Sequence, residues 1–295
     1  MSVFKTLKSY SKTQLKEKFF ASLFAFCAMV SILAVAMICL FLFSNAIPTM
    51  HQIGVFDFLF GLDWYPTEEI FGILPMIVGS LYVTALAILI GVPLGVLSAV
   101  YLSQFCPPKV ARFLLPAVEL LGAIPSVVYG FFGLVVIVPF LSDIFSGISG
   151  KSVLAAAIIL SIMVLPTIIL VSKAAIDSVP RSYYEGALAL GASKERAVFF
   201  AALPAAKSGI LASVILGVGR AIGEAMAVIM VAGNQTQIPS SVLDGVRTLT
   251  TNIVMEMGYS EGLHRDVLIA NGVVLFVFIL LINVSFNLLK KDKTD

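Results

Sequence analysis

Arg220 and Glu224 are the residues whose types and spacing carry the most chemistry, because they are the only charges between residues 208 and 232. Four residues make about one helical turn, so on a continuous helix both side chains lie on one face. Arg220 follows Lys207 by 13 residues, which is about 20 Å of helix. An arginine at that depth in a bilayer costs at least about 2.5 kcal/mol. We therefore expect it to face inward and to have a use.

Two uses fit this pair of charges. The first is a structural ion pair that joins helices. The second is a path for an anion, because a guanidinium is always charged and offers a planar fork to phosphate-like oxygens, while Glu224 neutralises it when the path is empty. At 100° per residue, one stripe of small and polar residues includes both charges: Ala206, Gly209, Ser213, Gly217, Arg220, Glu224 and Ala227. We expect Ser213, Arg220 and Glu224 to line the path, although close helix packing also explains the nearby glycines.

The elements that position this pair follow from the composition. Of the 295 residues, 59% are hydrophobic and 12% charged, and the mean hydropathy is +1.04. This composition excludes an ordinary soluble enzyme and requires a lipid bilayer as part of the solvent. The sparse basic residues do not favour nucleic-acid binding. The apolar stretches predict an all-α protein with six transmembrane helices, at about 19–44, 73–102, 113–141, 152–175, 207–232 and 267–289.

The distribution of Lys and Arg predicts the orientation. Fifteen of these residues fall on the side that would hold both termini, and three fall on the other side. Because cytoplasmic loops are enriched in Lys and Arg, both termini are predicted to be cytoplasmic. The chain then divides into a cytoplasmic segment 1–18, a membrane domain 19–289 and a cytoplasmic tail 290–295.

The sequence offers no site for covalent chemistry. Gly150-Lys151-Ser152 resembles the end of a phosphate-binding loop, but Phe145 occupies the position of its first glycine. His51 and His264 are isolated in the sequence, so no metal site is expected. We therefore predict no catalytic residue, no cofactor and no ATP site in this chain.

Residues 176–206 resemble the cytoplasmic signature of ABC importer permeases. The matching positions are Glu185-Gly186-Ala187, Gly191 and Leu203-Pro204, while Gly186 and Ala201 depart from the pattern. The resemblance implies the MetI-like permease fold and a short coupling helix within 181–204. In that family this helix binds a groove of the ATPase subunit, which assigns the coupling role to Glu185, Ala187 and Gly191.

Three further stretches, 71–95, 122–134 and 217–234, are similar to the C-type permease of phosphate-specific uptake systems. The resemblance implies a subunit of an inorganic phosphate importer in a bacterial inner membrane. Its expected partners are an A-type permease forming a heterodimer, two ATPase subunits and an extracytoplasmic phosphate-binding protein. In this family, charged residues matching Arg220 and Glu224 are implicated in phosphate passage.

Two alternatives stay open at this point. A permease for sulfate, molybdate or phosphonate would have the same spacing of elements. An ion-coupled secondary transporter would use Glu224 as its titrating group.

Overall fold

The computed structural model describes residues 12–145 and 149–291, so the predicted segments 1–18 and 290–295 lie largely outside it. The elements of the first half are α1 (Lys12–Ile53), α2 (Val55–Phe60), β1 (Trp64–Tyr65), a 3-10 turn (Pro66–Glu68), β2 (Ile70–Phe71), α3 (Leu74–Val100), the π-helical segment η2 (Tyr101–Phe105), α4 (Pro108–Ala123), α5 (Ser126–Phe132), the π-helical segment η3 (Gly133–Ile137) and α6 (Val138–Ile144).

The second half is also helical. Its elements are α7 (Val153–Asp177), α8 (Arg181–Ala189), α9 (Lys194–Ala197), the π-helical segment η4 (Val198–Ala202), α10 (Leu203–Gly223), α11 (Met226–Val231), α12 (Leu249–Glu256) and α13 (Gly262–Lys291). Within the described residues, six helical segments are long and apolar enough to cross a bilayer. The predicted all-α, six-helix membrane fold is therefore confirmed.

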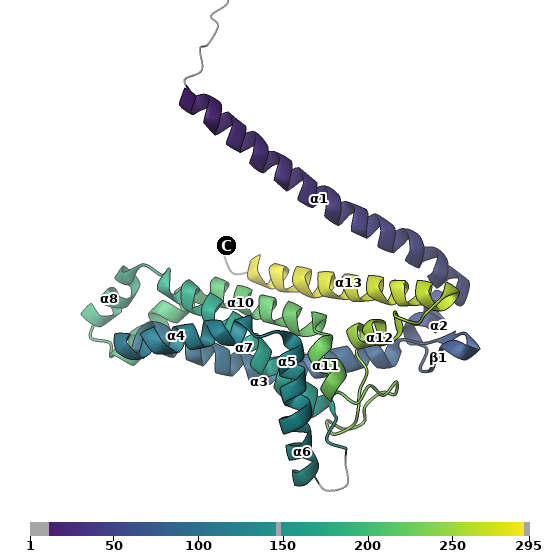
Figure 1. The fold of residues 1–295 in the computed structure, drawn as a ribbon. Helices are drawn as coiled ribbons and strands as arrows, with labels where there is room; N and C mark the ends of the chain where they lie inside the picture. The colour runs from purple at the N-terminus through teal and green to yellow at the C-terminus, as the bar shows by residue number, and fades with distance from the viewer. Residues whose placement is uncertain (1–11, 146–148, 292–295) are drawn as a thin grey trace, which may run out of the picture.

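The core of the bundle is α7, which packs between α3 and α10 (Figure 1). Small residues allow these backbones to approach closely, as is common where helices meet in membranes. A Cβ on Gly91 would lie 2.9 Å from Val164 Cγ2, and one on Gly95 would lie 2.7 Å from Ile168 Cγ2. Larger residues at these two positions of α3 would therefore separate it from α7.

The N-terminus of α7 is fixed by residues distant in sequence. Ser152 Oγ accepts a hydrogen bond of 3.2 Å from Ala155 N, the usual N-cap contact. The next two backbone N–H groups, of Val153 and Leu154, donate to Asp244 O and Val242 O at 2.9 and 2.8 Å. The segment between α11 and α12 therefore closes the end of the central helix.

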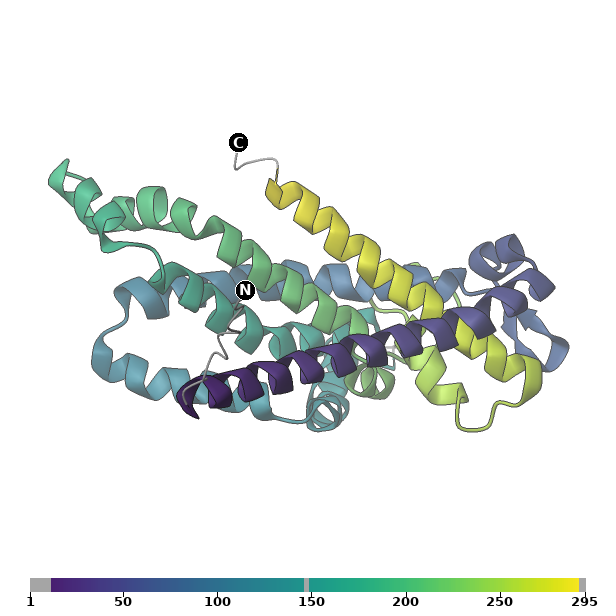
Figure 2. The ribbon, with the colours of Figure 1, turned by 90° about the horizontal axis from the view of Figure 1, so that it is seen from above.

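Helix α1 diverges from the rest of the bundle. It contacts α13 near the end that bears α2 and β1, and then runs away from the bundle (Figures 1 and 2). Its apolar side chains are exposed in the isolated chain: Phe24 is 67% and Ile32 72% accessible. Such a surface requires lipid or another protein as its neighbour.

Two of the predicted transmembrane helices are not continuous. The predicted helix 113–141 is interrupted at Ile124 and Pro125, where the backbone becomes extended. Because proline disfavours a helical conformation at the preceding residue, the break falls between α4 and α5. α4 runs along the bundle, whereas α5 and α6 turn away from it at a steep angle (Figure 1). The predicted helix 207–232 is also broken, as described below.

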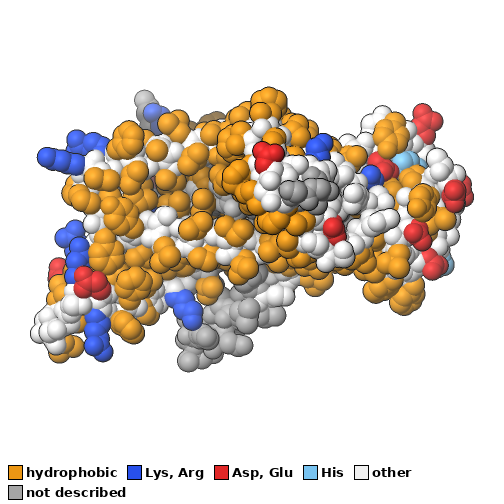
Figure 3. Space-filling view, turned by 90° about the horizontal axis from the view of Figure 1, so that it is seen from below, with side chains coloured by type: hydrophobic (Ala, Val, Ile, Leu, Met, Phe, Trp, Pro, Cys, Tyr) orange, Lys and Arg blue, Asp and Glu red, His pale blue; other side chains and the backbone are white. Residues whose placement is uncertain are grey.

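The two ends of the bundle differ in charge. Lys and Arg gather at the end that carries α8, and Asp and Glu gather at the end that carries α2 and β1 (Figure 3). We call these the basic end and the acidic end. The basic end carries α8, which lies in the segment expected to be cytoplasmic, and the orientation of the two ends stays a prediction.

Candidate functional site: a broken helix around Arg220

Arg220 lies in the last turn of α10, which ends at Gly223. Glu224 has an extended backbone (φ −75°, ψ 127°), and helix resumes in α11 at Met226. The prediction of one continuous helix carrying both charges on one face is therefore wrong. The break lies well inside the bundle (Figure 1). Unwound backbone at such depth is tolerated where protein or a wet cavity satisfies its polar groups.

Arg220 is only partly satisfied by its surroundings. Its Nη1 donates to Thr167 Oγ1 of α7 at 3.3 Å. In the described part of the chain Arg220 forms no ion pair with a carboxylate. A guanidinium has five N–H donors, so most of them are available to another group.

Glu224 has a different partner from the one expected. Its Oε1 accepts a hydrogen bond of 3.1 Å from Ala227 N and so caps the N-terminus of α11. Its backbone carbonyl accepts one of 2.9 Å from Thr250 Oγ1, which satisfies the unwound backbone from another segment. A carboxylate at a helix N-terminus is stabilised by the helix dipole. The expected neutralisation of Arg220 by Glu224 is not seen among the described residues.

The stripe that contains Ser213 faces α7. Ser213 is fully buried, and its Oγ lies 2.6 Å from Ser172 Oγ. A Cβ on Gly217 would lie 3.1 Å from Ile168 Cγ1, whereas Cβ atoms on Gly219 and Gly223 would meet nothing within 4 Å. Close packing therefore explains Gly217 but not the other two glycines. Ser213 lies at a helix contact in this conformation, and its role in a substrate path stays a prediction.

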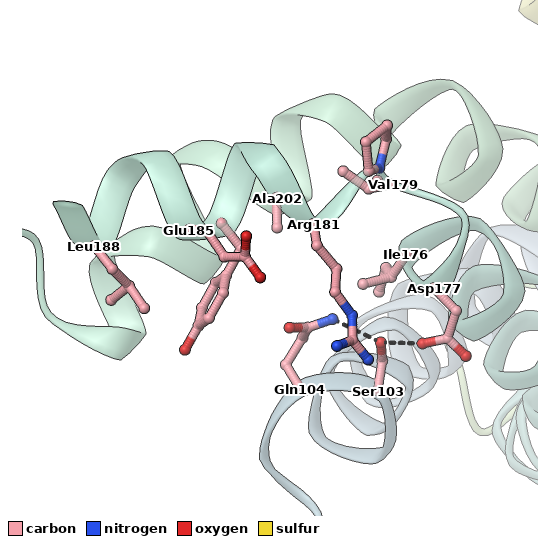
Figure 4. A pocket seen from close by; sticks show the side chains of 11 residues that line it. Ser103, Gln104, Ile176, Asp177, Val179, Arg181, Glu185, Leu188 and Ala202 are labelled. Carbon is pink, nitrogen blue, oxygen red and sulfur yellow. Dashed lines mark hydrogen bonds between the residues drawn. The ribbon is translucent and has the colours of Figure 1, made fainter. Parts of the chain in front are cut away.

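A second candidate site lies at the basic end, where α8 projects from the bundle. A hollow of about 610 Å³ is lined by α8, the end of α7 and two π-helical segments (Figure 4). Glu185 and Arg181 of α8 face it, opposite Ser103 and Gln104 of η2. Asp177 accepts a hydrogen bond from Ser103 and pairs with Lys173.

The predicted coupling residues surround the end of α8. Glu185 is exposed, Ala187 is half-buried, and Gly191 follows the helix with φ +86°. A Cβ on Gly191 would have open space around it, so the left-handed backbone is what favours glycine there. The sequence prediction that Gly191 ends this helix is confirmed.

At the acidic end, four side chains form a cluster that the sequence did not predict. The Glu256 carboxylate accepts a hydrogen bond of 3.0 Å from Trp64 Nε1, and it pairs with Arg247 Nη1 at 2.6 Å and His264 Nε2 at 2.9 Å. The Glu256 side chain is only 7% exposed. We call these residues the outer cluster. It ties β1, α12 and α13 to the segment after α11, and no sequence spacing indicated it, because Trp64 and Glu256 are 192 residues apart.

The segment between α11 and α12 has its own carboxylate anchor. Asp244 accepts hydrogen bonds from the Ser240 hydroxyl at 2.7 Å and from the backbone N–H groups of Ser240 and Ser241 at 2.8 Å each. The bond from the Ser240 hydroxyl contributes most, and together they hold the pKa of Asp244 below its ordinary value. No group of three or more metal-ligating side chains gathers among the described residues.

The arrangement of helices defines the class of protein. The fold is similar to the MetNI methionine ABC transporter in an inward-facing conformation (TM-score 0.62, 20% identity, 79% of this chain and 100% of that one). It is also similar to a bacterial ABC transporter involved in the import of the acidic polysaccharide alginate (TM-score 0.59, 17% identity, 94% of this chain and 100% of that one). The fold is that of an ABC importer permease, as the sequence resemblance implied.

Sequence comparison places the chain more narrowly. Residues 91–294 match the family described as "Binding-protein-dependent transport system inner membrane component". The chain is 42% identical to the probable ABC transporter permease protein YqgH of Bacillus subtilis over 87% of this chain and 86% of that protein. It is 36% identical to the phosphate transport system permease protein PstC of Mesorhizobium japonicum over 82% and 80%. The chain therefore belongs to the family of binding-protein-dependent transport system inner membrane components, and it is a multi-pass membrane protein.

Proposed function

We propose that this chain is the membrane-spanning subunit of an ATP-driven importer of inorganic phosphate and contributes half of the translocation path. The observation that carries the proposal is Arg220, a charged fork inside the bundle whose only hydrogen bond in the described chain goes to the neutral Thr167 hydroxyl. The similarity of the chain to a phosphate transport system permease supports phosphate as the anion.

The open face of α10 gives the anion its route. Gly219 and Gly223 leave room beside Arg220, because a Cβ on either glycine would meet no atom of the described chain within 4 Å. A second permease of the A type would complete the path across this face. Arg220 and Glu224 would then act at the break, the guanidinium on the anion and the carboxylate on the end of α11.

The other partners belong at the two ends. One of the two ATPase subunits would bind α8 and the residues around Glu185, Ala187 and Gly191, and the other would bind the second permease. The basic end would be cytoplasmic together with both termini. ATP would be hydrolysed in those subunits and not in this chain. A phosphate-binding protein would deliver the anion at the acidic end. In a bacterial inner membrane, the path would alternate between a state open to the outside and a state open to the cytoplasm. ATP and the loaded binding protein would shift this equilibrium because each binds one state more tightly than the other.

The test of the path is Arg220→Ala in the complete transporter in proteoliposomes, with Arg220→Lys as the matched control that keeps the charge but not the fork. Hydrogen bonds to charged groups contribute about 1.5–3 kcal/mol each, so phosphate uptake should fall at least about ten-fold for the alanine variant and less for the lysine variant. The complex should still assemble. Normal uptake by Arg220→Ala would refute the proposed path.

The same preparation separates the alternatives. Competition by sulfate, molybdate or phosphonate stronger than by unlabelled phosphate would assign another oxyanion. Uptake by vesicles that contain the permeases without an ATPase would indicate a secondary transporter.

The coupling role is tested with Glu185→Lys and Gly191→Asp, which should separate ATP hydrolysis from transport. An unchanged ATPase response to the loaded binding protein in these variants would contradict the coupling role.

A further inference from the structure

We infer that the acidic end carries a second binding site for the transported oxyanion, in a hollow lined by Asn234, Gln235, Thr236, Gln237 and Arg247. This amide-lined hollow measures about 370 Å³, the space of about a dozen water molecules. The inference rests on the proposed function, because it places a second station on the same anion route.

Arg247 is held in a fixed orientation at the wall of this hollow. Its Nε donates to Asn234 O at 3.1 Å, and its Nη1 contacts Asn252 Oδ1 at 3.1 Å and Glu256 Oε1 at 2.6 Å. Its remaining nitrogen, Nη2, makes no hydrogen bond to any described residue. The side chain is 13% exposed. A guanidinium held in this way loses little conformational entropy when it binds a ligand.

The rest of the lining is neutral. Gln235, Thr236 and Gln237 can donate hydrogen bonds, whereas the buried Oδ1 of Asn234 is an acceptor without a partner among the described residues. The side chains of Gln235, Thr236 and Gln237 make no hydrogen bond within residues 12–145 and 149–291. No carboxylate is among the residues that line the hollow, but the Glu256 carboxylate pairs with Arg247 at 2.6 Å and offsets part of its charge, so the anion would bind at the free Nη2. A second hollow at the same end, of about 320 Å³, is lined by Asp57, Asp63 and Glu69 and would repel an anion. Of the two, the amide-lined hollow has the chemistry that an oxyanion requires.

The hollow lies at the end of α11 opposite to the break. Asn234 Nδ2 donates to Ile229 O of α11 at 2.8 Å, and Val246 N donates to Ala232 O at 2.7 Å. The six residues of α11 span about 9 Å. One short helix therefore separates the guanidinium of Arg247 from the level of Arg220. An anion that enters at the acidic end would meet Arg247 first.

The test changes the charge of the hollow without disturbing the contacts of Arg247. Gln237 is exposed, so Gln237→Glu and Gln237→Lys place opposite charges at the same position. Thr67→Glu, an exposed position on the turn between β1 and β2, is the control for charge elsewhere on the acidic end. Initial rates of phosphate uptake and the ATPase response to loaded binding protein are measured with the complete transporter in proteoliposomes.

We expect uptake to fall about five-fold for Gln237→Glu, as for a partly screened charge several ångströms from the anion. Gln237→Lys should lose much less uptake than Gln237→Glu, because its charge attracts the anion, and Thr67→Glu, outside the hollow, should keep the unmodified rate. Uptake by Gln237→Glu equal to that of the unmodified protein would overturn the inference. Equal losses of uptake and ATPase response in both Gln237 variants would also overturn it, because they would assign the hollow to contact with the binding protein. Normal uptake by Arg220→Ala would instead refute the proposed function.

Discussion

Thr167 is the single described side chain that orients the Arg220 guanidinium, and its removal gives a measurable prediction. The Arg220 Nη1 to Thr167 Oγ1 distance is 3.3 Å, slightly beyond the usual range for such bonds. Hydrogen bonds to charged groups contribute about 1.5–3 kcal/mol, so we take about 1 kcal/mol for this longer one. Thr167→Val keeps the shape of the side chain and loses the hydroxyl. At about 1.4 kcal/mol per factor of ten, phosphate uptake should fall about five-fold.

Thr167→Ser is the matched control, because it keeps the hydroxyl and removes only a methyl group. It should transport at close to the unmodified rate. The assay is the initial rate of labelled phosphate uptake by the complete transporter, measured also in the Arg220→Ala background. There Thr167→Val should have no further effect, because the two residues act through one contact. Unchanged uptake by Thr167→Val, beside a loss in Arg220→Ala, would refute the orienting role of Thr167.

Two further expectations concern the acidic end. Glu256→Gln leaves Arg247 buried without its charged partner and should destabilise the protein by about 1–3 kcal/mol in thermal unfolding. The control Glu261→Gln, at an exposed position, should change stability by less than about 0.5 kcal/mol. Equal stabilities of the two variants would mean that the outer cluster contributes nothing. Because hydrogen bonds lower the pKa of Asp244, its contribution is present above its unfolded pKa of about 3.9 and is lost as pH falls through the lower folded value. Proteolysis of segment 233–248 should therefore rise only below about pH 4 and should already be raised at neutral pH in Asp244→Asn; a rise between pH 7 and 5 in the unmodified protein would contradict this.

The sequence predicted the helices well where apolar length alone determines them. The predicted helix 152–175 is α7, Val153–Asp177, and the predicted helix 73–102 corresponds to α3 and part of η2. The end of α8 before Gly191 was also predictable, because a residue after a helix with positive φ favours glycine.

The breaks were less predictable, because the groups that satisfy them come from distant parts of the chain. Residues 208–232 look like one apolar span, yet Thr250 Oγ1 satisfies the carbonyl of Glu224 at the break. Periodicity likewise divided α10 into faces without showing which face meets α7. The contact of Ser213 with Ser172 shows that the face of α10 with small and polar residues packs on α7. The pattern of one helix could not show this, because it carries no information about the neighbouring helix.

The break also resolves an apparent conflict in the sequence. On a continuous helix, a glutamate four residues from an arginine would attract the guanidinium and repel any anion that approached it. In the structure the extended residue Glu224 directs its carboxylate to Ala227 N instead. The charge that would oppose an anion is then used to stabilise α11, and the field of Arg220 remains available. Under the proposed function, the same two residues would form a neutral pair in a straight helix and an anion site in the broken one. The break between Gly223 and Met226 would then be the feature that selects the second.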